Sequence, residues 1–121
     1  MEKLKSLLKE LMQKMEIKEN VRLKIVPMKY KIASFSFHTN TLRLNKRIIS
    51  ILNTEEVKYI LTHELVHAKI KSLYHGRFFQ EELEKYYNIE EIQKLEKQII
   101  EKLYEKICSI SFPKEISYKI F

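Results

Sequence analysis

The sequence predicts a single α+β domain in which a small antiparallel sheet of about three strands packs against a central helix, with an N-terminal helix and C-terminal helices around them. Two segments that alternate apolar and polar residues, 21–28 and 32–44, predict strands. Three longer segments repeat apolar residues every three or four positions, which predicts amphipathic helices. A chain of 121 residues is the usual size of one domain, so we expect one domain over residues 1–121.

The N-terminal part supplies one helix and the strands. Residues 3–17 place leucines and methionines on one helical face. Residues 21–28 read VRLKIVPM, and Pro27 confines this strand to an edge or an end of the sheet because proline lacks a backbone N–H. The tripeptide 38–40 interrupts the second alternating segment with turn-forming residues. It predicts a hairpin with His38 exposed at the turn.

Capping residues mark the helices of the C-terminal part. Asn53 or Thr54 can cap a central helix that should run to about Ser72. Gly76, the only glycine of the chain, suits a left-handed position at a helix end. Arg77 then resumes a helical pattern.

A third long helix is predicted after this pattern. Asn88 followed by Glu91 resembles a reciprocal cap at its start, and Pro113 ends it. The tail after Pro113 is short and apolar, so we expect it to pack against the protein.

Composition restricts the class of protein. The chain contains no run of 18 apolar residues and no signal peptide, so we expect a cytoplasmic protein without a membrane partner. The net charge of +7 allows nucleic acid as a partner, but 23 basic residues are interleaved with 16 acidic ones, which favours an ordinary solvated surface. The single cysteine, Cys108, is interpreted as a packed side chain.

The segment HELVHAKIKSLYHG, residues 63–76, contains three of the four histidines and the only glycine. On a helix His63 and His67 lie one turn apart on the same face, so both imidazoles can bind one metal ion. Glu64 lies beside them. This is the HExxH arrangement, in which two histidines bind zinc and the glutamate takes a proton from the attacking water.

An enclosed site is predicted around this motif. Burying the Glu64 carboxylate without a partner would be costly, whereas a metal provides an opposite charge. In helical projection apolar residues lie on both sides of the histidines: Val57, Ile60, Leu61, Leu65 and Ala68 on one arc, and Tyr59, Val66 and Ile70 on the other.

A catalytic zinc has three protein ligands, so a third must follow the motif. His75 is favoured because Gly76 could turn the chain so that the preceding residue reaches the metal. The alternatives are glutamates on the next helix: Glu81, Glu82 and Glu84.

HELVH followed by HGRFF, and preceded by TLRLNKRIISILNTEEVKYIL, resembles the small zinc metallopeptidases called minigluzincins. These are similar to the catalytic domains of HtpX-like membrane peptidases and to SprT-like and YgjP-like proteins. The resemblance covers roughly residues 20–88. It implies that His63, His67 and His75 bind Zn²⁺ and that Glu64 is the general base and acid.

The resemblance also implies how substrate binds and how activity is controlled. A peptide or unfolded protein would pair with a rim strand around Ser34, Phe35 and Ser36. Residues 1–88 would form the catalytic core, and residues 89–121 would block the cleft or exchange with a second chain in a homodimer. The residue that stabilises the oxyanion is left open among Tyr74, Arg77, Tyr104 and Tyr118.

The function predicted is therefore a zinc-dependent endopeptidase, with latency through the C-terminal segment as an expectation. One alternative is a SprT-like peptidase recruited to nucleic acid by its basic charge. The other is a non-enzymatic metal-binding module, for which replacing Glu64 would have no measurable effect.

Overall fold

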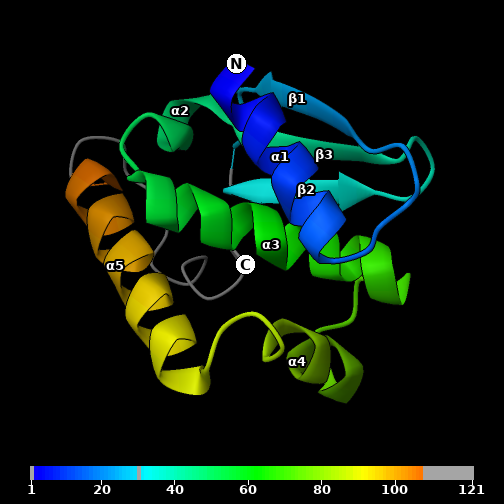
Figure 1. The fold of residues 1–121 in the computed structure, drawn as a ribbon. Coiled ribbons are helices and arrows are strands. Elements are labelled where there is room, and N and C mark those ends of the chain that lie inside the picture. Colours follow the sequence, from blue (N-terminus) through cyan, green and yellow to red (C-terminus); the bar gives the residue numbers. More distant parts are fainter. Residues whose placement is uncertain (1, 30, 108–121) are drawn as a thin grey trace.

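A sheet of three strands and the helices around it make up the computed structural model, which describes residues 2–29 and 31–107 (Figure 1). The α+β class and the three strands are confirmed. The elements in order are α1 (Glu2–Lys14), β1 (Arg22–Val26), β2 (Ala33–Ser36), β3 (Thr41–Asn45), α2 (Lys46–Ile49), α3 (Thr54–Ile70), α4 (Arg77–Leu83) and α5 (Ile89–Ile107). The short helix α2 was not predicted. None of the described helices is long and apolar enough to cross a membrane.

The strand order is β1-β3-β2, and the sheet is mixed. β2 and β3 form the predicted antiparallel hairpin, with Phe35 opposite Leu42. β1 lies parallel to β3, with Leu23 opposite Leu42, so the prediction of an entirely antiparallel sheet was wrong. β1 is an edge strand and ends just before Pro27, as proline requires.

The buried side chain of Asn45 binds the segment that connects the two edge strands. The segment between β1 and β2 crosses the end of β3 to reach the opposite edge of the sheet. The Asn45 side chain accepts a hydrogen bond from the Met28 N–H (3.2 Å) and donates to the carbonyl oxygens of Met28 (3.0 Å) and Lys31 (2.7 Å). These bonds satisfy backbone groups of the segment that runs between β1 and β2, which lie on opposite sides of β3.

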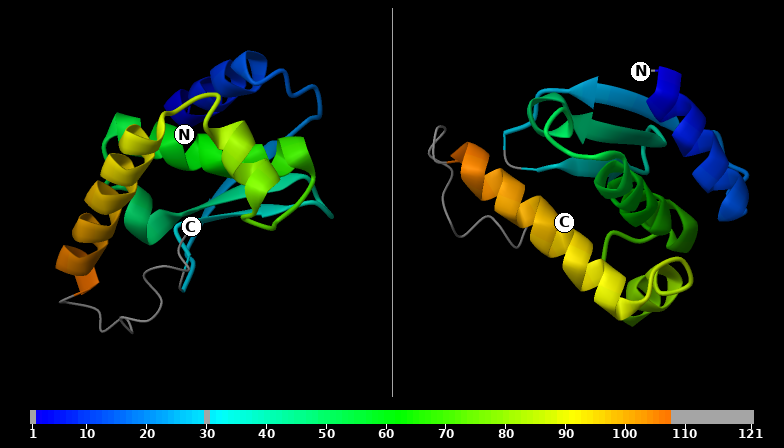
Figure 2. Two further views of the ribbon diagram at one scale, coloured as in Figure 1. Left: turned by 90° about the horizontal axis from the view of Figure 1, so that it is seen from below. Right: turned by 60° about the vertical axis from the view of Figure 1, so that its left-hand side comes forward.

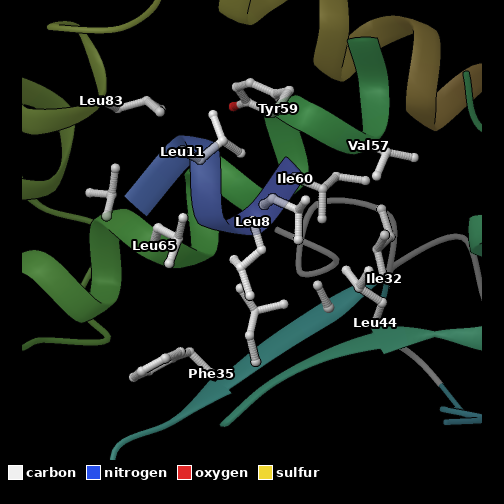
Figure 3. Packing of buried hydrophobic residues seen from close by; sticks show 14 of the residues in the cluster. Leu8, Leu11, Ile32, Phe35, Leu44, Val57, Tyr59, Ile60, Leu65 and Leu83 are labelled. Carbon is white, nitrogen blue, oxygen red and sulfur yellow. The ribbon is translucent and has the colours of Figure 1, made fainter. Parts of the chain in front are cut away.

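One face of the sheet and two helices enclose the core. Alternation along the strands puts Phe35 and Leu44 on the face that α1 and α3 cover (Figure 3). Leu8 and Leu11 of α1 and Leu65 of α3 also belong to this core. Beyond α3, α4 and α5 form a further layer (Figures 1 and 2). The helix α3 is therefore covered on several sides.

The start of α3 confirms its predicted cap. Asn53 and Glu56 form a capping box, in which each backbone N–H donates to the other residue's side chain (2.9 and 2.8 Å). The helix ends earlier than predicted, because Lys71 takes the left-handed conformation with a φ of 57°.

Gly76 does not take that role. Its φ is −95° and it precedes the first residue of α4, so the prediction of a left-handed glycine was wrong. A Cβ atom at this position would lie 2.2 Å from Cε1 of Tyr74. The absence of a side chain therefore gives room to the Tyr74 ring.

The helix α5 has its predicted cap, with reciprocal hydrogen bonds between Asn88 and Glu91 (3.1 and 2.8 Å). It is held to α3 by an ion pair between Lys102 and the fully buried Glu56 (2.5 Å) and by a hydrogen bond from the Tyr59 hydroxyl to Glu96. Apolar residues of α5 are buried as well: Ile92, Ile99 and Leu103. The predictions for Cys108, Pro113, Tyr118 and the tail fall outside the described residues.

Candidate metal centre

Three histidines from two segments meet at one point. His63 and His67 lie one turn apart on α3, and His75 comes from the connection between α3 and α4. One ring nitrogen of each lies within 4.8 Å of those of the other two, so the three could hold a metal ion. His63 and His67 are each 3% exposed, whereas His75 lies at the surface. The site is thus closed on the α3 side and open toward His75.

The end of α3 orients the His67 ring. The left-handed Lys71 reverses the chain, so that the Ser72 carbonyl oxygen lies 2.9 Å from His67 Nδ1. A carbonyl can only accept, so Nδ1 carries the proton and Nε2 has a free lone pair. Metal-binding histidines commonly make such a bond through the nitrogen that does not bind the metal. The donor set therefore fits a metal ion.

Phe79 of α4 forms an apolar wall of the site. Its ring centroid lies 4.7 Å from that of His63, 4.6 Å from that of His67 and 4.8 Å from that of His75. In the sequence, Phe79 is part of a helical pattern that gave no indication of this role. The feature of the sequence that could have indicated this role is the position of Phe79, four residues after His75 and at the start of a predicted helix.

Two of the clustered histidines, His67 and His75, are uncharged at neutral pH. Burial lowers the pKa of His67 to about 4, although the nearby negative charge of Glu64 opposes this shift. Burial also lowers the pKa of His75, and the charge of His63 acts in the same direction. Neutral imidazoles have the lone pairs that a metal requires.

Lowering the pH is expected to destabilise the metal-free protein. A histidine in the unfolded chain titrates near pH 6.5, whereas the pKa of His67 in the folded protein is about 4. Between these values the unfolded chain binds more protons, so the free energy of unfolding falls as the pH decreases from about 6.5 to about 4. Urea denaturation of the metal-free protein across this range measures the effect.

The control for this experiment separates His67 from other histidines. The variant His67→Gln should show a flatter pH profile, whereas His38→Gln, in the exposed turn between β2 and β3, should keep the wild-type slope. A wild-type profile without a slope between pH 6.5 and about 4 would contradict a buried neutral His67.

Glu64 is buried next to the histidines. It is 5% exposed, and its Oε1 lies 3.8 Å from His63 Nδ1. The glutamates considered as alternative ligands lie elsewhere. Glu82 is bonded to Lys85 and Tyr86, and Glu81 forms an exposed ion pair with Arg77 (2.8 Å). Neither of these two glutamates belongs to the three-histidine group.

The residues expected to bind substrate lie on β2, an edge strand that packs beside α3. Among the described residues β2 pairs with β3 alone, so it is an edge strand of the described sheet. The Phe35 side chain points into the core and is 5% exposed, while Ser34 and Ser36 are half-buried on the other face. Any contact from Phe35 to a peptide on this edge would be made by its backbone.

The fold and the site together define a class of protein. A buried helix with the HExxH motif, a third histidine from the following loop and an adjacent edge strand are the arrangement of a small metallopeptidase. The chain belongs to the family of YgjP-like metallopeptidase domains, whose model matches residues 1–102. This confirms the resemblance found in HELVH and HGRFF.

Solved structures and curated relatives agree with this family. The crystal structure of the metallopeptidase zymogen of Methanocaldococcus jannaschii jannalysin is 45% identical with a TM-score of 0.78, and the match covers 83% of this chain and 96% of that chain. The metallopeptidase zymogen of Pyrococcus abyssi abylysin is 34% identical with a TM-score of 0.78, covering 84% and 95%. The protein MJ0123 of Methanocaldococcus jannaschii is 45% identical over 100 residues, which are 83% of this chain and 91% of that protein. The comparisons do not favour the nucleic-acid or the non-enzymatic alternative.

Proposed function

We propose that this metallopeptidase is a zinc-dependent endopeptidase whose metal is held by His63, His67 and His75. The observation that supports it most is the meeting of three imidazole nitrogens within 4.8 Å beside a buried glutamate. Three protein nitrogen ligands with an open fourth position are typical of catalytic zinc. When bound, zinc lowers the pKa of a water to about 7 and polarises the carbonyl of the scissile bond.

Glu64 acts as the general base and then as the general acid. Its carboxylate takes a proton from the attacking water and returns it to the nitrogen of the leaving amine. Its position next to His63 on α3 supports this role, because the helix holds the carboxylate beside the ligand set. Its burial strengthens the interaction with charge that develops during the reaction.

The substrate is an extended peptide or an unfolded protein. It adds a strand to the outer edge of β2 at Ser34, Phe35 and Ser36. The backbone N–H and C=O of Phe35 lie on this outer side, because the antiparallel pairing directs those of Ser34 and Ser36 toward β3. Affinity then comes from main-chain hydrogen bonds, so the preference for particular side chains is loose. Tyr74, adjacent to His75 and 78% exposed, remains a candidate for stabilising the oxyanion.

The C-terminal segment, residues 89–121, controls access to the site of the catalytic core, residues 1–88. Two of the similar structures are of metallopeptidase zymogens, which supports a latent form. In the described residues α5 packs on α3 of its own chain through the Lys102–Glu56 ion pair. A homodimer formed by exchange of this helix stays a prediction.

Cleavage of casein in the presence of zinc tests both proposals. A form of the protein that ends at Phe112 is expected to cleave casein, and the full-length protein is expected to do so several-fold more slowly. A zinc chelator should abolish cleavage by both forms, and added zinc should restore it.

The outcomes separate the two proposals. Equal rates for the two forms would contradict latency and leave the endopeptidase intact. Absence of cleavage by both forms, or cleavage that a chelator does not affect, would contradict the zinc endopeptidase.

A further inference from the structure

A second polar cluster lies close to the metal site, and none of its members belongs to the three-histidine group. At its centre is Glu82 of α4, which is 7% exposed. Its carboxylate accepts hydrogen bonds from the Tyr86 hydroxyl (2.8 Å) and Lys85 Nζ (3.0 Å), and Lys69 Nζ of α3 lies 3.5 Å from the same carboxylate. A buried carboxylate with three donors around it is well satisfied.

The side chain of Lys69, on α3, connects this cluster to the residue that follows α1. Its Nζ also donates to the carbonyl oxygen of Met15 (2.6 Å), just after α1, and to the Tyr86 hydroxyl (3.4 Å). The cluster therefore joins the ends of α1 and α3 to α4 and the residues that follow it. The residues of this cluster come from segments far apart in the sequence. The cluster therefore stabilises the packing of these segments against one another.

The two helices that this cluster joins are those that form the metal site. Lys69 lies two residues after His67 on α3. Glu82 lies one turn after Phe79 on α4, and Phe79 contacts all three histidine rings. His75 lies in the connection that these helices bound. The distance between α3 and α4 therefore determines whether His75 reaches the other two histidines.

Within residues 2–29 and 31–107, few other contacts hold the helix α4 in position. It spans only Arg77–Leu83, and so short a helix is not stable by itself. Its other ion pair, Arg77–Glu81, is exposed and contributes little. The remaining contacts are apolar, from Phe79 and Leu83. These contacts bury area but are not directional.

We propose that Glu82 is a positioning residue of the metal site, a proposal that rests on the proposed function because it requires a metal bound by the three histidines. By binding Lys69 and Tyr86, Glu82 holds α4 against α3. In that position of α4, the side chains of His75 and Phe79 stay next to those of His63 and His67. Residues outside the ligand set that orient the ligands commonly change metal affinity by 10–100-fold when replaced.

The test compares two glutamates of the same helix. Glu82→Gln is expected to weaken zinc affinity about 10-fold or more, measured by competition with a chromophoric chelator on the full chain well below its unfolding temperature. Glu81→Gln, which breaks only the exposed pair with Arg77, should bind zinc within about twofold of the wild type. The absorption spectrum of bound cobalt should change in Glu82→Gln and stay unchanged in Glu81→Gln.

A milder variant keeps the proposal testable if Glu82→Gln does not fold. Tyr86→Phe removes one donor and keeps the ring, so it should weaken zinc affinity in the same direction by a smaller factor. Zinc affinity and cobalt spectra equal to the wild type in a folded Glu82→Gln, even with a lower unfolding temperature, would show a merely structural role and overturn the proposal. A wild type that binds no zinc would overturn the proposed function, and this inference with it.

Discussion

Replacing His75 with alanine is expected to lower the zinc affinity of the protein by more than about 100-fold. Losing a residue that only orients a ligand lowers metal affinity by up to about 100-fold, and losing a ligand itself should lower it further. His75 is the third imidazole of the cluster, and a site with only two protein ligands binds zinc weakly. Because His75 lies at the surface, its loss should leave the fold intact. Isothermal titration with zinc measures the change, and circular dichroism monitors the fold.

The matched control is His38→Ala, which removes the histidine that lies outside the cluster. It is exposed in the β2–β3 turn, so its loss should leave zinc affinity unchanged. Wild-type affinity in His75→Ala would contradict the three-histidine site. It would require another donor to complete the ligand set.

Replacing Glu64 with glutamine is expected to reduce peptide cleavage by about 10²–10⁴-fold, the usual contribution of a general base. Glutamine has the shape of glutamate but cannot accept the proton. Zinc content should stay at the wild-type value, because Glu64 is not one of the three clustered ligands. The rate of casein cleavage and the zinc content, both measured on the form that ends at Phe112, give the two readouts.

Glu55→Gln is the control for this variant. Glu55 is an exposed residue in the first turn of the same helix, so its replacement should leave cleavage unchanged. A Glu64→Gln variant that keeps more than about a tenth of the wild-type rate would exclude Glu64 as the base.

Features with local chemical causes were predictable from the sequence. The capping boxes at Asn53 and Asn88 each depend on residues three positions apart. The spacing of His63 and His67 places both on one helical face whatever surrounds the helix. The turn that begins at His38 has its own turn-forming residues, which predicted the β2–β3 hairpin.

Features that depend on contacts between distant segments were not predictable in this way. The parallel pairing of β1 with β3 joins segments about 19 residues apart, and the connecting segment is bound by Asn45, 14 and 17 residues later in the chain. Gly76 was mispredicted for a different and local reason, because the ring of Tyr74, two residues earlier, occupies the space that a Cβ atom would fill. Glycine at a helix boundary usually indicates a left-handed backbone, and the ring contact leaves no periodic signal.

The candidate site also combines features that the local sequence predicts with features that depend on contacts between helices. The HExxH motif predicted that His63 and His67 would meet, and His75 was favoured as the third histidine over glutamates of the next helix. Neither signal predicted that Phe79 would contact all three histidines or that Lys69 would reach Glu82. Phenylalanine and glutamate at these positions fit an ordinary amphipathic helix. Their role becomes visible only when α4 is placed against α3.

The metal content of the wild-type protein shows whether the three histidines bind zinc. Full-length protein purified without chelators or an affinity tag would be analysed by mass spectrometry. The three-histidine site predicts one equivalent of zinc per chain. Absence of bound metal, even after dialysis against zinc, would contradict the account and leave HELVH as part of a packed helix without a metal.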